Sequence, residues 1–221
     1  MTFRLVKASV NRNPFVGLFC RANDELAIVS PRLDKRFVEH ACAALSARPV
    51  EVFIDSSPYL GVLIALNSKG CVTYQRASER EVKTLKKAGL NVCLLSSPCA
   101  PGNTVLCNDR AAVISPKIPR KEAGRVADAL GVEVFQQAFG GLQCFAATSV
   151  VTNKGLYAYN ELSEVEFKHL EKLFKVRGMI GTSNFGVPYN SLGIVANSHG
   201  SLAGDLTTGF EIQRIYEALA P

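Results

Sequence analysis

Hydrophobic and polar positions along the chain fall into a unit that returns five times. Each unit has two short apolar runs on either side of a turn, and the turns are centred on asparagines that stand 44, 41, 45 and 44 residues apart: Asn23, Asn67, Asn108, Asn153 and Asn197. A period of about 20–50 residues is typical of repeat architectures. Asparagine with glycine close behind it provides the positive φ angles of tight turns, so each unit predicts a β-hairpin.

A helical period begins 14 or 15 residues after each asparagine. Apolar residues recur there at the spacing of one helix face, and the five sets are Val38, Ala41, Cys42 and Leu45; Val82, Leu85 and Gly89; Ala123, Val126, Ala127 and Leu130; Phe167, Leu170 and Phe174; and Ile212, Ile215, Tyr216 and Leu219. The residues four positions ahead of these sets suit a helix start: Asp34, Ser78, Pro119, Ser163 and Thr208. Three of them form a capping box with Glu81, Glu166 and Glu211. We therefore expect one amphipathic helix in each unit.

A further strand follows each of the first four helices, and we predict these strands at 50–54, 91–95, 132–135 and 176–180. The strand expected after the fifth helix is found instead at the start of the chain, at 3–8. We infer that this segment completes the fifth unit and closes a ring, which removes exposed sheet edges. The prediction is one α/β domain, 1–221, with repeats at about 11–54, 55–95, 96–136, 137–180 and 181–221.

The segments that lead into the hairpins are small, neutral and partly aromatic, and by symmetry they should surround one mouth of the ring. They are 13–17, 57–61, 100–104, 145–149 and 189–193. This composition favours a flat docking surface. The alternative is that the prolines and glycines merely satisfy turn geometry.

The chain has 25 Lys and Arg against 19 Asp and Glu, a net charge of +6, yet positions 178–204 carry no charged residue. A basic body favours an anionic partner such as nucleic acid, although solubility alone would also explain the positive charge.

The chain has seven cysteines, an odd number without a C-x-x-C pair, which disfavours a disulfide framework or a clustered zinc site. We expect reduced core cysteines in a cytoplasmic protein. The apolar runs are too short to span a membrane.

Nothing in the sequence favours catalysis or a cofactor. His40 and His169 lie on predicted helices with charged neighbours and should face solvent, and His199 falls in the fifth hairpin turn. Asp205 precedes the last helix, where a carboxylate helps to cap it. The sequence has no phosphate loop, dinucleotide fingerprint or metal-ligand spacing.

Several short motifs, in a fixed order over the whole chain, carry a family resemblance. They are Gly102-Asn103 leading to Cys107-Asn108-Asp109, then 132–135 (VEVF), 151–155 (VTNKG), 173–176 (LFKV), 195–200 (VANSHG) and 205–211 (DLTTGFE). The chain resembles the translation initiation factor 6 family in its archaeal form. That resemblance implies the pentein fold, five quasi-identical units about an axis.

The resemblance also implies a non-enzymatic factor, expected to be monomeric. Such a factor binds the intersubunit face of the large ribosomal subunit, blocks docking of the small subunit, and takes part in late maturation of the large one. The implied partners are ribosomal protein uL14, a neighbouring small ribosomal protein and the sarcin–ricin region of the large rRNA. Asn103 matches a family asparagine at that contact, while Val62 and Thr148 stand where eukaryotic members have a basic and an aromatic residue. Symmetry extends the predicted ribosome interface to Gly61, Gly102 and Ser191.

Two other functions remain open at this point. Penteins include guanidine-modifying hydrolases and transferases, which resemble one another in a cysteine nucleophile late in the chain. Here no cysteine follows Cys144, and the candidates beyond Gly178 are His199, Asp205, Glu211 and Glu217. The second alternative is a ring that binds nucleic acid generically.

Overall fold

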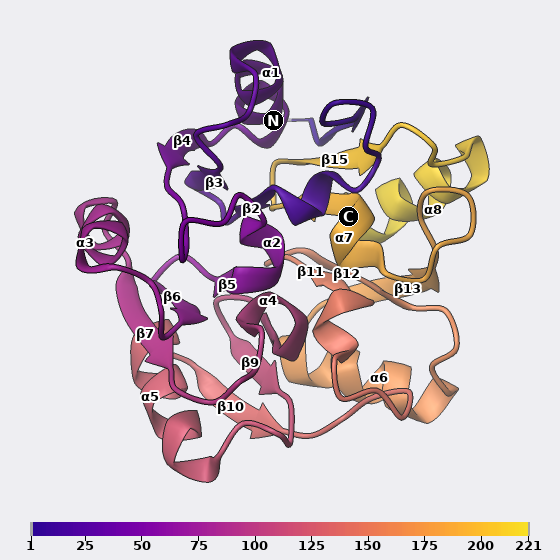
Figure 1. The fold of residues 1–221 in the computed structure, drawn as a ribbon. Helices are drawn as coiled ribbons and strands as arrows, with labels where there is room; N and C mark the ends of the chain where they lie inside the picture. Colours follow the sequence, from indigo (N-terminus) through magenta and orange to yellow (C-terminus); the bar gives the residue numbers. More distant parts are fainter. Residues whose placement is uncertain (1, 221) are drawn as a thin grey trace.

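The computed structural model describes residues 2–220 and shows five three-stranded blades around a central axis (Figure 1). The two ends of the predicted domain, residues 1 and 221, lie outside the described residues. Each blade joins an antiparallel hairpin to a third strand that runs parallel to the second strand of the hairpin. In blades 1 to 4 a long helix connects the second strand to the third.

The blades follow one another in chain order. Blade 1 contains β2 (Cys20–Ala22), β3 (Leu26–Val29), α1 (Lys35–Leu45) and β4 (Arg48–Glu51). Blade 2 contains β5 (Ile64–Leu66), β6 (Gly70–Tyr74), α3 (Glu79–Lys87) and β7 (Asn91–Leu95). Blade 3 contains β8 (Val105–Cys107), β9 (Ala111–Ile114), α5 (Arg120–Leu130) and β10 (Glu133–Gln136). Blade 4 contains β11 (Val150–Val151), β12 (Gly155–Tyr159), α6 (Glu164–Phe174) and β13 (Arg177–Gly181). Blade 5 contains β14 (Ile194–Ala196), β15 (Gly200–Gly204) and α8 (Gly209–Leu219).

The N-terminal strand closes the ring, as predicted. β1 (Arg4–Ala8) pairs in parallel with β15, with Arg4 opposite Gly200 and Ala8 opposite Gly204. It therefore takes the place in blade 5 that β4, β7, β10 and β13 take in the other blades. The first strands of adjacent blades are also in contact all the way round the axis.

The predicted helix starts are all confirmed. Asp34, Ser78, Pro119, Ser163 and Thr208 are the N-cap residues, and the three predicted capping boxes are formed. Two details of the predicted stripes are wrong. Gly89 lies beyond the end of α3, where its φ of 99° suits the chain reversal after a helix. Tyr216 is 43% exposed because it lies on the outer side of α8, where its ring packs in a T-shaped arrangement with that of Phe3.

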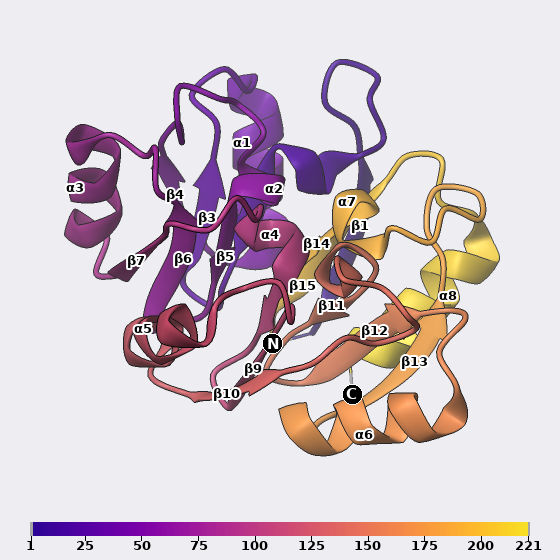
Figure 2. The same ribbon diagram turned by 60° about the horizontal axis from the view of Figure 1, so that its bottom comes forward.

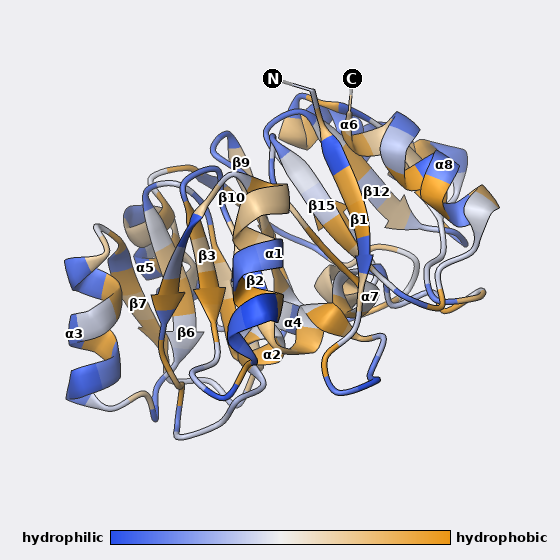
Figure 3. Cartoon of the chain, turned by 90° about the horizontal axis from the view of Figure 1, so that it is seen from above, coloured by the Kyte–Doolittle hydropathy of each residue, from blue (hydrophilic) through white to orange (hydrophobic). Residues whose placement is uncertain are grey.

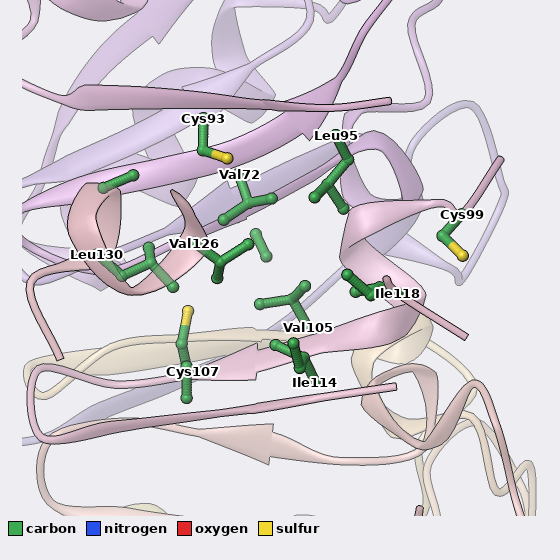
Figure 4. Close-up of a cluster of buried hydrophobic side chains, with 13 residues drawn as sticks. Val72, Cys93, Leu95, Cys99, Val105, Cys107, Ile114, Ile118, Val126 and Leu130 are labelled. Carbon is green, nitrogen blue, oxygen red and sulfur yellow. The ribbon is translucent and has the colours of Figure 1, made fainter. Parts of the chain in front are cut away.

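The hydrophobic core is divided among the five interfaces between blades. Each long helix packs between its own blade and the preceding one: for example, Val126 and Leu130 of α5 meet Val72 and Cys93 of blade 2 (Figure 4). Equivalent clusters lie at the other four interfaces. A blade cannot bury its apolar surface alone, so the ring is stable only when closed.

The cysteines are all unpaired. Five are buried, Cys42 is half-buried, and Cys144 is exposed, so the expectation of core cysteines is wrong for Cys144. That residue lies in the loop after β10, outside the strands and helices that form the cores.

The hairpin turns lie together at one end of the axis, and we call this end the turn face, formed by residues 23–25, 67–69, 108–110, 152–154 and 197–199. The asparagine side chains there link neighbouring blades. Nδ2 of Asn108 donates to the carbonyls of Thr152 (3.1 Å) and Phe174 (3.1 Å), the latter being the last residue of the next blade's helix. Its Oδ1 accepts from the N–H groups of Arg110 and Ala111 in its own turn.

Asn67 and Asn197 repeat both inter-blade bonds, and Asn23 donates to the carbonyl of Asn67 (2.8 Å). In blade 4 the equivalent position is held by Thr152 rather than by Asn153, one residue from the register that the sequence suggests. The Thr152 hydroxyl organises its own turn but makes no inter-blade bond within residues 2–220.

The residues that follow these asparagines close the axis at the turn face. Asp24 accepts from the N–H (2.8 Å) and hydroxyl (2.9 Å) of Ser198, and Asp109 accepts from the same groups of Ser68. Nδ2 of Asn153 donates to both carboxylates, at 2.9 Å to Asp24 and 2.6 Å to Asp109. This network gives the two carboxylates hydrogen-bond donors from three other blades.

The predicted positive φ angles of the turn asparagines are wrong. Among the described residues, positive φ occurs elsewhere, for example at Asn11, Arg12, Asp55 and Ser56, in turns after the outer strands. The turn asparagines act through side-chain hydrogen bonds instead. Gly70 is required for a different reason, because a Cβ there would overlap the carbonyl oxygen of Ala129 in the adjacent helix.

The opposite end of the axis carries five single-turn helices where the sequence predicted loops. They are η1 (Val16–Leu18), α2 (Leu60–Leu63), α4 (Pro101–Thr104), η2 (Phe145–Ala147) and α7 (Asn190–Gly193). They contact one another in a closed circle, and we call this end the short-helix face. Figure 2 shows α2, α4 and α7 together near the axis, and Figure 3 shows them in the lower middle of the view, toward one end of the axis.

Neighbouring short helices approach so closely that a side chain does not fit between several of them. A Cβ on Gly61 would lie on the carbonyl oxygen of Gly17, one on Gly102 on that of Gly61, and one on Gly17 on that of Ser191. Ala146 and Ser191 hold the equivalent positions in blades 4 and 5. The circle therefore depends on small residues at one position of every repeat.

We predict that Asn108→Ala lowers the free energy of unfolding by about 4 kcal/mol, since it removes four hydrogen bonds worth roughly 1 kcal/mol each. Chemical denaturation of the two proteins measures this difference. The exposed Asn91 is the control, and Asn91→Ala should change stability by less than about 0.5 kcal/mol. Equal effects of the two substitutions would contradict the proposed role of the turn asparagine.

We predict that Gly61→Ala costs about 3 kcal/mol, because the added methyl forces α2 away from η1. Gly124→Ala is the matched control: nothing lies within 4 Å of its Cβ position, and alanine favours the helix by up to about 1 kcal/mol. Thermal or chemical unfolding should show opposite shifts. A stabilised Gly61→Ala variant would rule out the close approach of these backbones.

Candidate interaction surface at the short-helix face

The six residues predicted at the ribosome interface all lie on the short helices or directly beside them. Gly61, Gly102, Thr148 and Ser191 are buried, whereas Val62 and Asn103 are half-buried. The structure thus brings the six to one end of the axis. It also divides them into residues that build the circle of helices and residues that can be reached from outside.

The polar groups of the buried members are used inside the ring. The Thr148 hydroxyl donates to the carbonyl of Phe145 (2.8 Å), and the Thr148 carbonyl accepts from Nδ2 of Asn190 (3.1 Å). The carbonyl and hydroxyl of Ser191 accept from the Arg21 guanidinium at 2.6 and 3.0 Å. Gly61, Gly102, Thr148 and Ser191 therefore position the surface and offer no side chain to a partner.

The accessible part of the short-helix face comes from the position after each small residue. Leu18, Val62, Asn103 and Leu192 occupy it and are half-buried, whereas Ala147 is buried. Apart from Asn103, these side chains are apolar. The prediction names both the small residue and its outward neighbour in blades 2 and 3, whereas in blade 5 it names the buried Ser191 and omits Leu192.

Aromatic side chains extend this apolar surface away from the axis. Tyr59 and Tyr189, the N-caps of α2 and α7, are 49% and 50% exposed, and Phe185 is 81% exposed. The Tyr59 ring lies 5.7 Å from that of Phe19. Sequence reasoning placed Tyr59 and Tyr189 in the right loops but missed them as site residues. The signal for them is an aromatic residue two positions before the small residue in three repeats, where Phe15 is the third case.

Glutamates from the long helices fix the loops that lead into the short helices. Glu211 of α8 accepts from the N–H groups of Phe185 (3.2 Å) and Gly186 (2.8 Å), and Glu81 and Glu166 hold equivalent turns. Burial opposes ionisation of Glu211, but hydrogen bonds from Thr208, Gly186 and Thr182 outweigh it and lower the pKa of its carboxyl. In blade 1 the equivalent residue is Phe37, so the 10–13 turn has no such anchor from α1.

The rim of the short-helix face is basic on three blades and uncharged or acidic on two. The exposed residue two positions before each long helix's N-cap is Arg32, Arg76, Lys117, Glu161 or Leu206, in blade order. Residues 181–221 contain one cation, Arg214, and its guanidinium donates to the carbonyl of Ile180 at 2.7 and 3.1 Å. Blade 5 instead exposes Phe185, Leu206 and Phe210.

The candidate catalytic residues are not assembled into a site. His199 lies in a hairpin turn on the turn face, and Asp205 follows β15 at the opposite end of that strand. Glu211 is engaged by the turn at 184–186. His40 and His169 are exposed on their helices, as predicted. Burial raises the pKa of the Cys20, Cys71 and Cys107 thiols to about 12, which keeps them neutral.

Between residues 2 and 220, histidine, cysteine and acidic side chains do not gather in groups of three or more that could hold a metal ion. In the same range, no helix has both the length and the apolar character that crossing a membrane would need.

The eIF-6 family model matches residues 5–218 of the chain. The translation initiation factor 6 of Pyrococcus horikoshii is 36% identical over 214 residues, which is 94% of each chain. That of Thermococcus onnurineus is 34% identical over 220 residues (96% of each chain), and that of Saccharolobus islandicus is 35% identical over 220 residues, 97% of this chain and 98% of the relative. The five-bladed α/β ring is the pentein fold that this resemblance implies. The chain belongs to the eIF-6 family of translation initiation factors.

Proposed function

We propose that the protein binds the large ribosomal subunit through its short-helix face and thereby prevents the small subunit from joining. The expected contacts are ribosomal protein uL14, a neighbouring small ribosomal protein and the sarcin–ricin region of the large rRNA. Binding during late maturation of the large subunit would follow from the same contact. The mechanism is occupancy, and it needs no chemical step.

The observation that carries this proposal is the accessible apolar surface at the short-helix face, which is held by a rigid frame. The frame consists of backbones in direct contact, loops anchored by glutamates, and the Arg21 bonds between α2 and α7. A body that blocks a surface must not deform when another subunit collides with it. A preorganised interface also loses little conformational entropy on binding.

The two kinds of partner fit different parts of this face. The apolar centre and the uncharged blade 5, with Tyr59, Tyr189 and Phe185, suit the surface of a ribosomal protein. The basic rim of blades 1 to 3, with Arg32 and Lys117, suits rRNA phosphates. Arg76 is partly neutralised by Asp55 at 3.3 Å, so it contributes less to that rim.

Asn103→Arg should weaken binding to isolated large subunits at least tenfold, about 1.4 kcal/mol, because it places a charge and a longer side chain in the contact. Co-sedimentation of the purified protein with archaeal subunits measures the affinity. Asn91→Arg is the matched control: it makes the same exchange at an exposed position at the start of β7, next to the turn face. It should bind like the wild type, and both variants should unfold near the wild-type temperature.

Equal weakening by both variants would show that binding responds to the added charge and not to the face that carries it. Unchanged binding of Asn103→Arg would mean that the turn face makes the contact.

The same assay at rising salt tests the rRNA contact. The affinity should fall with salt, but less steeply than for a protein that binds phosphates alone. Binding that is independent of salt would exclude the rRNA part of the proposal. Subunit joining should recover in parallel with the loss of binding.

A further inference from the structure

We propose that the axial cavity of the ring binds a monovalent anion of halide size, with the Arg21 guanidinium as its cationic partner. The cavity lies between the short-helix face and the turn face and has a volume of about 70 Å³. Every blade contributes to its wall through a first strand, with Ala22, Ala65, Leu106, Val151 and Val195 among the lining residues. The proposal does not depend on ribosome binding.

Arg21 is the cationic residue in the lining of this cavity, and it comes from β2. Its Nη1 donates to the Ser191 carbonyl (2.6 Å), and its Nη2 donates to the Gly61 carbonyl (2.7 Å) and the Ser191 hydroxyl (3.0 Å). A guanidinium has five N–H groups, so these three bonds leave two without a protein acceptor. Arg21 is half-buried and lines the cavity.

No carboxylate balances this charge. The ion pairs among residues 2–220 are Arg76 with Asp55 and Lys168 with Glu164, and the cavity wall contains neither aspartate nor glutamate. The axial carboxylates of Asp24 and Asp109 are held at the turn face by Ser198, Ser68 and Asn153. The buried thiols nearby are neutral. Burial lowers the pKa of Arg21 to about 10, so the group remains charged at neutral pH.

Enclosing an unpaired charge is costly unless a counter-charge or several hydrogen bonds offset it. Three carbonyl or hydroxyl oxygens offset part of this cost, and an anion on the two remaining N–H groups would offset more. A buried water molecule needs roughly 10–15 Å³ of cavity volume, so this cavity accommodates an anion together with a few waters.

The wall also decides which anion fits. A single cation favours a single negative charge, whereas a sulfate or phosphate would bring a second charge among aliphatic side chains and carbonyl oxygens. The apolar part of the wall tolerates a large, weakly hydrated ion. Chloride and bromide have both properties.

Bromide is the probe for the test, because it can be located by anomalous scattering. Crystals of the full chain soaked in sodium bromide should show an anomalous peak on the axis within hydrogen-bonding distance of the Arg21 guanidinium. In solution, sodium bromide and sodium chloride should raise the unfolding temperature saturably, by a few degrees, relative to sodium gluconate at equal ionic strength. Gluconate is too large for the cavity.

Arg21→Met keeps an unbranched stem in place of the aliphatic part of arginine and removes the guanidinium with its charge, so both the peak and the halide-specific shift should be lost. Wild-type crystals without an axial peak would overturn the proposal, and so would a peak that persists in Arg21→Met. A peak in the crystal with no halide-specific shift in solution would indicate binding at crystal concentration only, which also overturns it. If Arg21→Met does not fold, the wild-type crystal and the comparison of salts still decide.

Discussion

The side-chain amide of a turn asparagine is the interaction on which the arrangement of the blades depends. The asparagine accepts hydrogen bonds within its own hairpin turn through Oδ1, and its Nδ2 donates to a carbonyl in the equivalent turn of the next blade. In three blades Nδ2 also donates to the carbonyl of the last residue of the next blade's long helix. Each such residue therefore sets the angle between two blades. Since five blades must meet without a gap, a small error at one interface would prevent closure of the whole ring.

The other constraints follow from this closure. The short helices at the opposite end meet so tightly that Gly17, Gly61 and Gly102 have no room for a side chain. The core lies between blades rather than within them, and β1 completes blade 5 from the far end of the chain. The turn of blade 4 lacks the asparagine bond to the next blade, and blades 4 and 5 are joined by the packing of Tyr157 with Ile215 and Leu219 and by the bond from Asn190 to the Thr148 carbonyl. Burial raises the pKa of the Tyr157 hydroxyl to about 12, and this hydroxyl donates a hydrogen bond to the Thr182 carbonyl.

Local signals in the sequence were sufficient to predict the architecture, but not to predict which side chains are accessible on the short-helix face. Cap residues such as Ser78 and Thr208 and the period of the asparagines depend on short-range geometry, so helices, hairpins and ring closure could be predicted. Whether Gly61 or Val62 faces outward depends on how closely two distant segments approach, which no local pattern encodes. The same is true of Asn108, whose position in a turn was evident but whose bonds to Thr152 and Phe174 depend on the next blade. The residues suggested by the family resemblance lie together at one end of the axis, and the structure separates those that support this end from those that are accessible on it.

The central claim is that the five blades unfold as one cooperative unit. Native-state hydrogen exchange tests it most directly. If inter-blade contacts hold the ring, the slowest amides of β3, β6, β9, β12 and β15 should exchange with free energies within about 1 kcal/mol of global unfolding. β15 matters most, because it pairs with the N-terminal strand. Exchange of one blade at a free energy several kcal/mol below the others would mean that the ring opens locally, which would contradict this account.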